Sequence, residues 1–335
     1  MATSSGSAGV PARLRPQPGG AGVARGWLLR LCPLRVWAAV AALAGPASAA
    51  PTSAPRLLLL DGAMAGADVI AVGEHGAILR SSDPAAGWHR IASPTRATLT
   101  AVSFATLAAP RLGWAVGHDA LILATSDGGR TWAKQYQGES LQDSFLDVLA
   151  LDAQRVIAVG AYGLARVTAD GGRTWEKRTF SAEDTHYNRI SRGPSGTLYL
   201  AGERGTLLRS ADRGETWQPL RAPYEGSFYG VLPLEGRTLV AYGLRGHAYL
   251  SADDGVSWRL IATPAPALLA TAIRTRGGPL LFAGQARAVF VSRDGGNTIA
   301  SIPGALATAV AELLELPDGR LLAFGEAGVT LFPPP

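Results

Sequence analysis

The stretches TSDGGRTW (residues 125–132) and TADGGRTW (168–175) differ at one position and lie 43 residues apart. Two further copies, SADRGETW (210–217) and SADDGVSW (251–258), follow at similar intervals. SSDPAAGW (81–88) is a degenerate earlier copy, and SRDGGNTI (292–299) is a later copy that ends in isoleucine instead of tryptophan. Self-similarity at a fixed period indicates that the chain is built from equivalent structural units.

The copies share an aspartate, and successive aspartates are separated by 44, 43, 42, 41 and 41 residues. A second landmark, an apolar run followed by a turn of the form Gly-x-x-Gly, keeps the same phase. Its leading glycines are Gly73, Gly117, Gly160, Gly202, Gly243, Gly284 and Gly325. The sequence therefore contains seven units.

Each unit alternates short apolar runs with glycine or aspartate turns. The second unit reads LTAVSFA, RLGWAVG, LILATS and TWAKQYQ, and runs of this length and composition are typical of β-strands. Four strands in a repeat of about 40 residues indicate a propeller blade. We find no helical periodicity of useful length after residue 50. The predicted fold is all-β, a seven-bladed β-propeller over residues 50–335.

The eight-residue motif falls between the third and fourth strands of each unit. Its aspartate can accept backbone hydrogen bonds, its glycines can supply positive φ, and its tryptophan can bury a large area between blades. The motif resembles the Asp box of sialidase-type BNR repeats, and we interpret it as a folding device. The residues given this structural role are Asp127, Trp132, Asp170, Trp175, Asp212, Trp217, Asp253 and Trp258. The tryptophans expected to be buried between blades are Trp88, Trp132, Trp175, Trp217 and Trp258.

Residues 1–49 lie outside the repeats. They contain five arginines and no acidic residue, and the last arginine is followed by the short apolar stretch VWAAVAALAGPASAAP (36–51). A basic region, an apolar run and an Ala-x-Ala site at residues 47–49 are typical of a secretory signal peptide. The apolar run is too short to cross a bilayer of about 30 Å. We predict cleavage near Ala49 or Ala50 and export, with the periplasm as the destination.

The leader also accounts for the excess of basic residues. The whole chain has 31 basic and 26 acidic residues, a net charge of +5, and without the five leader arginines the two numbers are equal. The charge therefore favours neither nucleic-acid binding nor attachment to an anionic membrane, and we expect no membrane insertion after cleavage. The single cysteine, Cys32, lies in the leader, so the mature protein has no disulfide or thiolate metal site.

The seventh unit ends early. It contains AVAELLELPDG, RLLAFG and VTLF and then stops at three prolines, so a fourth strand is lacking. Propellers manage an unpaired edge by borrowing a strand from the other terminus. The candidate segment is Pro51 to Pro55 running into RLLLL (56–60), although its prolines make a poor strand.

Binding residues are expected on the face that carries the Gly-x-x-Gly turns and the linkers between blades, because the Asp boxes occupy the other face. The third residue of each turn gives the series His75, Asp119, Tyr162, Arg204, Arg245, Ala286 and Ala327. Two neighbouring units thus place arginine in one position. The linkers on either side of unit four add the remaining candidates, and the predicted binding set is Arg189, Arg192, Arg204, Arg221, Tyr224, Phe228 and Arg245. Arginine forks suit carboxylates, and aromatic neighbours supply contact area.

Seven such units behind an export signal resemble the photosystem II assembly and stability factors of chloroplasts and cyanobacteria, together with their relatives in bacteria that have no photosystem. The likeness covers residues 55–335 and extends to NRISRGPSGTLYLAGERG (188–205). It implies a non-catalytic scaffold outside the cytoplasm that holds a membrane-protein precursor by an arginine-rich face. PYEGSFYG (223–230) and GLRG (243–246) are more similar to the bacterial relatives, which implies an envelope protein as the partner. The arginines of the predicted binding set favour an acidic or carboxylate-bearing segment of that partner.

Two alternatives stay open. Sialidases share Asp boxes and propellers, and glycoside hydrolases usually need two carboxylates or a tyrosine nucleophile. Glu183, Asp184 and Glu225 are available loop acids, but the arginine segment typical of sialidases is missing, and the nearest match, YNRI (187–190), is followed by serine. A passive carbohydrate-binding propeller is the other alternative. No histidine pair has metal-site spacing, so we expect no metal and no cofactor.

Overall fold

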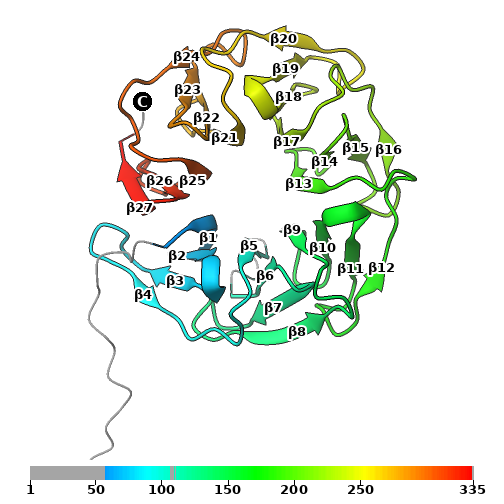
Figure 1. The fold of residues 1–335 in the computed structure, drawn as a ribbon, viewed down its shortest axis with the longest axis vertical. Helices are drawn as coiled ribbons and strands as arrows, with labels where there is room; N and C mark the ends of the chain where they lie inside the picture. The colour runs from blue at the N-terminus through cyan, green and yellow to red at the C-terminus, as the bar shows by residue number, and fades with distance from the viewer. Residues whose placement is uncertain (1–56, 106–108, 110, 334–335) are drawn as a thin grey trace, which may run out of the picture. The chain divides into compact units, whose positions relative to one another are not determined.

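The structure is a computed structural model that describes residues 57–105, 109 and 111–333. In it the chain forms seven antiparallel sheets that follow one another around a ring (Figure 1). In chain order the sheets are β1–β4, β5–β8, β9–β12, β13–β16, β17–β20, β21–β24 and β25–β27, here called blades one to seven. The all-β, seven-bladed propeller predicted from the repeats is confirmed.

The first strand of every blade is the innermost one, and the later strands follow outward (Figure 1). The strands of blades one to four are β1 (Leu59–Ala65), β2 (Asp68–Gly73), β3 (Ile78–Ser81), β4 (His89–Arg90), β5 (Leu99–Phe104), β6 (Gly113–Gly117), β7 (Leu121–Thr125), β8 (Ala133–Gln137), β9 (Phe145–Ala150), β10 (Val156–Gly160), β11 (Ala165–Thr168), β12 (Glu176–Lys177), β13 (Tyr187–Arg192), β14 (Leu198–Gly202), β15 (Leu207–Ser210) and β16 (Gln218–Pro219). Those of blades five to seven are β17 (Phe228–Pro233), β18 (Leu239–Gly243), β19 (Ala248–Ser251), β20 (Arg259–Ile261), β21 (Leu269–Arg274), β22 (Leu280–Gly284), β23 (Val289–Ser292), β24 (Ala300–Ser301), β25 (Val310–Glu315), β26 (Leu321–Gly325) and β27 (Gly328–Phe332). Short 3₁₀ turns follow the second strand in blades one, three and five: η1 (Glu74–Gly76), η2 (Ala161–Gly163) and η3 (Leu244–Gly246).

The second strand of each blade is apolar without alternation because both of its faces are covered. In β10, Val156 and Ala158 pack against blade two, whereas Ile157 and Val159 pack against blade four. Successive side chains of a strand point to opposite faces, so one strand contributes to two interfaces. Apolar clusters of this kind lie between all seven pairs of neighbouring blades.

The turn after the second strand places its third residue in the left-handed region. The residues there are His75, Asp119, Tyr162, Arg204, Arg245 and Ala286, with φ between 50° and 61°. A side chain in this region is strained by about 1 kcal/mol or more, and the rest of the blade must stabilise it. Since six blades share the conformation, it belongs to the repeat rather than to one functional residue.

The Asp-box turns have the geometry that the motif predicts. The Asp127 carboxylate accepts hydrogen bonds from the amides of Arg130 (2.9 Å) and Thr131 (3.0 Å) and from the Thr131 hydroxyl (2.7 Å). The Thr125 hydroxyl donates to the same carboxylate and accepts from the Gly129 amide. Asp170, Asp212, Asp253 and Asp294 repeat the arrangement in later blades.

The prediction for the tryptophans is right for two residues and wrong in degree for three. Trp88 and Trp132 are buried, with 3% and 8% of their surface exposed. Trp175, Trp217 and Trp258 pack against the apolar clusters but are only partly buried. The motif places each ring just before the short outer strand, where one side of the ring meets the neighbouring blade and the other reaches the rim.

Blade seven has three strands within the described residues, and it meets blade one through side chains. Leu59 and Trp88 of blade one share an apolar cluster with Leu316, Leu322 and Phe324 of blade seven. Gly62 is needed there, because a Cβ atom at this position would lie 2.3 Å from the Phe324 ring.

The prediction that the segment around RLLLL (56–60) completes blade seven is wrong for its last two residues. Leu59 and Leu60 belong to β1 in blade one and not to an outer strand of blade seven. Pro51 to Pro55 lie outside the described residues, as do the predicted signal peptide and its cleavage site.

Candidate binding face and axial channel

The turns and linkers sort onto two faces. On the linker face, the Gly-x-x-Gly turns contact the linkers between blades, as in the bonds from the Gly163 amide to the Thr185 carbonyl and from the Gly205 amide to the Gly226 carbonyl (both 2.8 Å). On the Asp-box face, the Asp-box turns contact the turns between first and second strands, as in the bond from the Gly171 amide to the Gln154 carbonyl.

Arg204 and Arg245 occupy equivalent turns of blades four and five on the linker face. Both side chains are exposed, and both residues have left-handed backbone conformations. Neither forms an ion pair with another described residue. Their guanidinium groups are therefore available to an external acceptor.

Tyr224 lies on the linker between the two blades that carry these arginines. It lies on the linker that contacts the turn of Arg204, and its ring stacks on His247, two residues after Arg245, with centroids 4.0 Å apart and planes 9° apart. The Nδ1 atom of His247 lies 2.9 Å from the Tyr249 hydroxyl, and this hydrogen bond fixes the orientation of the imidazole ring on which Tyr224 stacks. The linker is thus fixed against blade five by aromatic contacts.

Three predicted members of the binding set lie elsewhere or face inward. Phe228 is fully buried, because it is the first residue of the inner strand β17 and packs between blades four and five. Arg221 is exposed but borders a separate cavity of about 220 Å³ next to Trp258. Arg192 ends β13 near the Asp-box face, where its Nη1 atom donates to the Leu151 carbonyl at 3.4 Å. These residues lie near linkers in the sequence, but that nearness does not show where the inner strand of the next blade begins.

Arg189, the fourth misplaced member, points into the axial channel, where its Nη2 atom lies 2.5 Å from Glu312 Oε2. The channel cavity of about 360 Å³ is bordered by both side chains and by Asp61 and Asp147. Arg189 is therefore committed to an internal partner and separated from Arg204 and Arg245.

The predicted binding set leaves out part of the linker face. Tyr162 is 65% exposed and meets His186 edge-on, with centroids 4.5 Å apart, and His186 Nδ1 lies 3.5 Å from Glu203 Oε1. The position of Tyr162 in the turn series is the signal that could have found it. Acidic residues also share this face, on the linkers and turns around Arg204: Glu183, Asp184, Glu203 and Glu225. The face therefore offers discrete arginine forks rather than a uniformly positive surface.

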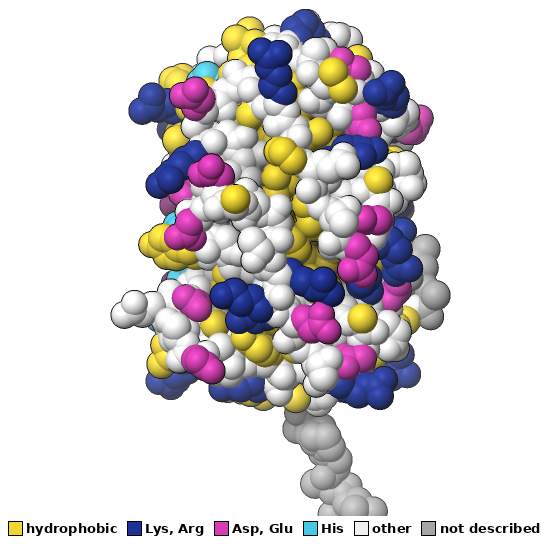
Figure 2. Space-filling model, turned by 90° about the vertical axis from the view of Figure 1, so that its right-hand side faces the viewer, with side chains coloured by type: hydrophobic (Ala, Val, Ile, Leu, Met, Phe, Trp, Pro, Cys, Tyr) yellow, Lys and Arg dark blue, Asp and Glu magenta, His cyan; other side chains and the backbone are white. Residues whose placement is uncertain are grey.

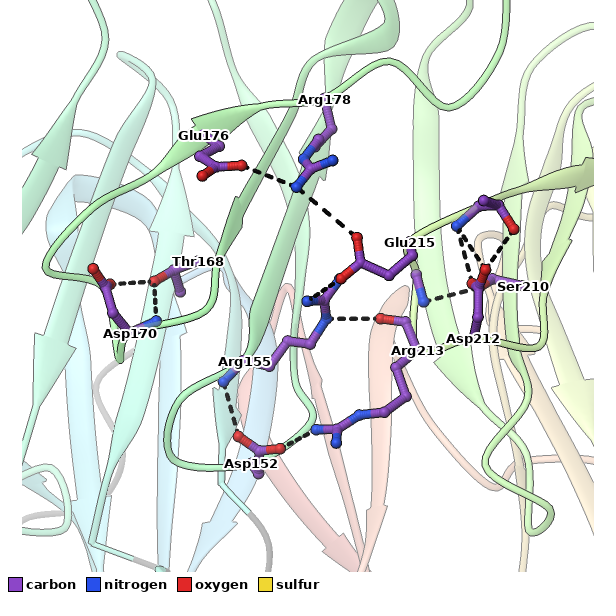
Figure 3. Close-up of polar contacts among 12 residues, drawn as sticks. Asp152, Arg155, Thr168, Asp170, Glu176, Arg178, Ser210, Asp212, Arg213 and Glu215 are labelled. Carbon is purple, nitrogen blue, oxygen red and sulfur yellow. Dashed lines mark hydrogen bonds and ion pairs between the residues drawn. The ribbon is translucent and has the colours of Figure 1, made fainter.

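Several arginines on the Asp-box face differ from Arg204 and Arg245 in forming bonds within the fold. Arg213 pairs with Asp152, and Arg155 pairs with Glu215 at 2.7 Å while its Nε atom donates to the Arg213 carbonyl (Figure 3). Within the Asp boxes, Arg130 donates to the Asp127 carbonyl. On the side of the molecule that lies to the right in Figure 1, basic and acidic side chains are interspersed, with apolar side chains between them (Figure 2). These arginines join neighbouring parts of the fold.

The fold and its turns define the class of protein as a seven-bladed β-propeller with Asp-box turns. Residues 136–281 match the family described as photosynthesis system II assembly factor YCF48. The resemblance predicted from the repeats is thereby confirmed. The matched segment contains all of blades three, four and five, together with Arg204, Tyr224 and Arg245.

Solved structures similar to this chain include two of YCF48. One, YCF48 bound to D1 peptide, has a TM-score of 0.70 and 19% sequence identity, covering 85% of this chain and 96% of that chain. YCF48 from Cyanidioschyzon merolae has a TM-score of 0.68 and 16% identity, with coverages of 85% and 98%. The WD40 β-propeller domain of Doa1 has a TM-score of 0.65 and 12% identity, with coverages of 84% and 94%. At these identities the likeness shows the fold. No protein of curated function matches the chain in sequence.

Neither a membrane-spanning helix nor a metal cluster is found in the part of the chain that the structure describes. No helix there is long and apolar enough to cross a bilayer. No group of three or more histidine, cysteine, aspartate or glutamate side chains there is placed to hold a metal ion.

Proposed function

We propose that this protein is an exported, non-catalytic scaffold that binds a segment of an envelope or membrane protein, or of its precursor, and assists its assembly or stability. The binding face is the linker face of blades three to five. The observation that carries the proposal is the pair Arg204 and Arg245, which occupy one turn position in neighbouring blades, are exposed and form no ion pair within the described residues.

The chemistry of the face indicates the kind of segment that it fits. Arginine presents a planar fork that binds carboxylates in a bidentate manner. Tyr224 and the exposed Tyr162 provide aromatic contact area on either side of Arg204, and tyrosine and arginine are the residue types that dominate binding at interfaces. The partner segment is therefore acidic or ends in a carboxylate.

The comparisons support this assignment for the region that carries the face. The segment matched by the YCF48 family contains both arginines and Tyr224. A similar structure, YCF48, is bound to a D1 peptide, so a propeller of this fold can hold a peptide of another protein. Export rests on the acid-free leader and its Ala-x-Ala site.

The test is capture of membrane proteins from the cell envelope by the wild-type protein and by R204E/R245E, quantified by mass spectrometry after cross-linking. We expect the variant to lose captured partners by about tenfold or more, because like charges at an interface cost several kcal/mol. The melting temperature should hardly change, since exposed substitutions alter stability by about 0.5 kcal/mol or less. Capture by the wild type should weaken as salt rises.

A matched control is R130E/R173E, which reverses two exposed charges on the Asp-box face. It should retain the captured partners. Equal recovery by R204E/R245E and the wild type would place binding elsewhere. Export is tested separately by N-terminal sequencing of the mature protein, which should begin near Ala50, and a retained Met1 would contradict it.

A further inference from the structure

The inner strands carry a common irregularity that builds the wall of the axial channel. Each of the seven skips one residue in its pairing with the second strand, which is a β-bulge. The residues that follow the bulge occupy equivalent positions around the ring: Asp61, Ala101, Asp147, Arg189, Gly230, Thr271 and Glu312. This layer therefore contains three carboxylates and one guanidinium.

Arg189 and Glu312 connect blades that are not neighbours. Arg189 lies on β13 of blade four, Glu312 lies on β25 of blade seven, and their side chains meet at 2.5 Å. They are 26% and 9% exposed. Glu312 Oε1 also accepts from the Thr271 hydroxyl of blade six (2.6 Å) and from the Leu313 amide (3.0 Å). One carboxylate thus joins three blades.

The two aspartates join other pairs of blades in the same layer. Asp61 of blade one accepts from the Val102 amide of blade two at 2.7 Å, and Asp147 of blade three accepts from the Ile190 amide of blade four at 2.8 Å. Their ionised forms also repel Glu312 and one another, and Arg189 offsets only part of this charge. Tyr242 on β18 borders the same cavity.

The protonation of the layer follows from this arrangement. Burial, followed by the nearby Glu312 carboxylate, raises the pKa of Asp61 well above its ordinary range. Burial also raises the pKa of Asp147 to about 6, although Arg189 and the Ile190 amide act in the opposite direction. Asp147 is therefore mostly protonated in mild acid and mostly charged at pH 8. Burial and the Glu312 carboxylate favour the protonated form of Asp61 as well.

We propose that the Arg189–Glu312 pair is a cross-channel clasp that holds blade seven in the ring and that loosens when negative charge develops on the neighbouring carboxyl groups of the channel. The seam between blades one and seven is the place where the clasp matters most. All junctions between blades are made by side-chain packing without a shared strand, but within the described residues this seam is also crossed by no linker, because β1 begins the ring and β27 ends it. Local opening starts where few interactions hold a segment.

The test is native-state hydrogen exchange, measured by mass spectrometry on the purified full chain. In R189M, the amides of β1 and β25–β27 should exchange about tenfold faster or more, whereas those of β6 and β7 in blade two should change less, because loss of one partner leaves Glu312 buried and unpaired. The matched control is R209M, which breaks the pair of Arg209 with Asp254 (2.9 Å; 26% and 18% exposed) between adjacent blades. It should leave the seam unchanged.

Uniform acceleration in R189M, or the same acceleration of the seam in R209M, would overturn the proposal. If R189M fails to fold, R189M/E312Q removes the pair without leaving a lone charge. That variant should still show faster exchange at the seam, and wild-type protection there would equally overturn the clasp.

A second measurement tests the dependence on protonation. After correction for intrinsic exchange rates, seam amides of the wild type should be about tenfold better protected at pH 5.5 than at pH 8. D61N/D147N should remove this difference, since both amide side chains keep an oxygen for the Val102 and Ile190 amides. An unchanged pH dependence in D61N/D147N would show that these two groups do not control the clasp.

Discussion

The aspartates of the Asp boxes and those of the channel layer are the same residue type under opposite conditions. Burial tends to raise the pKa of Asp127, but hydrogen bonds from Thr131, Thr125 and the Arg130 amide outweigh it and lower the pKa to about 2. Burial raises the pKa of Asp147 to about 6. All donors to Asp127 lie within four residues of it, whereas Asp147 also depends on Arg189, the Ile190 amide and Glu312, which belong to other blades.

The Asp box is therefore a local structure, whereas the channel layer is a tertiary one. An Asp box stabilises its own turn, and it would do so in any blade of the ring. The channel layer forms only when the seven inner strands meet. Each of its charged side chains depends on hydrogen bonds or an ion pair with residues of another blade. Variants of the two regions should therefore respond differently to substitution and to pH.

The largest loss of stability is expected when the tryptophan at the end of an Asp box is replaced. Trp132→Ala should lower the free energy of unfolding by about 3 to 5 kcal/mol, as for other large-to-small changes in a core. Trp132 is 8% exposed and meets Phe104 edge-on at 6.2 Å. Trp175→Ala is the matched comparison and should lose less, since its ring is partly exposed. Equal losses in urea unfolding would contradict this account of the motif.

An intermediate effect is expected from the carboxylates themselves. Asp127→Ala should cost about 1 to 2 kcal/mol at pH 7, because it leaves the turn amides of Arg130 and Thr131 without their acceptor. Asp147→Asn should change stability by less than about 0.5 kcal/mol at pH 5.5, where Asp147 is mostly uncharged and the asparagine oxygen can still accept from Ile190. Urea unfolding at the two pH values measures both, and a larger loss in Asp147→Asn would reverse the comparison.

A third effect, smaller than the losses expected for Trp132→Ala and Asp127→Ala, is a dependence of stability on pH with a definite sign. The folded-state pKa of Asp147, about 6, lies above its ordinary value of 3.8, so its contribution is complete below pH 3.8 and is lost as pH rises through 6. Stability should therefore fall by about 1 kcal/mol between pH 5 and pH 8. Asp127 acts in the opposite direction and only in strong acid, where its contribution is lost as pH falls from 3.8 to 2.

Denaturant unfolding across that range, with Asp147→Asn as the control, checks this prediction. The variant should have a flatter profile than the wild type. A wild-type profile that rises from pH 5 to pH 8 would mean that lowered carboxyl pKa values dominate this window.

Much of the binding face could be foreseen because it follows from the repeat. Arg204, Arg245 and Tyr162 occupy one position of a phased motif, so counting residues places them in equivalent turns. Phe228 and Arg189 could not be placed in this way. Both lie near linkers in the sequence, but each belongs to an inner strand, and the direction of a side chain there depends on the bulge and on the neighbouring blade.

The sequence alone determined the number of blades, the position of every Asp box and the equivalence of the turns, since these depend on hydrogen bonds and spacings within some 40 residues. Only the tertiary structure decided which arginines are exposed and which are bonded. Arg189 meets Glu312, a residue 123 positions away in the sequence, because ring closure brings blade seven opposite blade four. No pattern in the sequence predicts this contact. The two opposite charges come together only when the ring is closed.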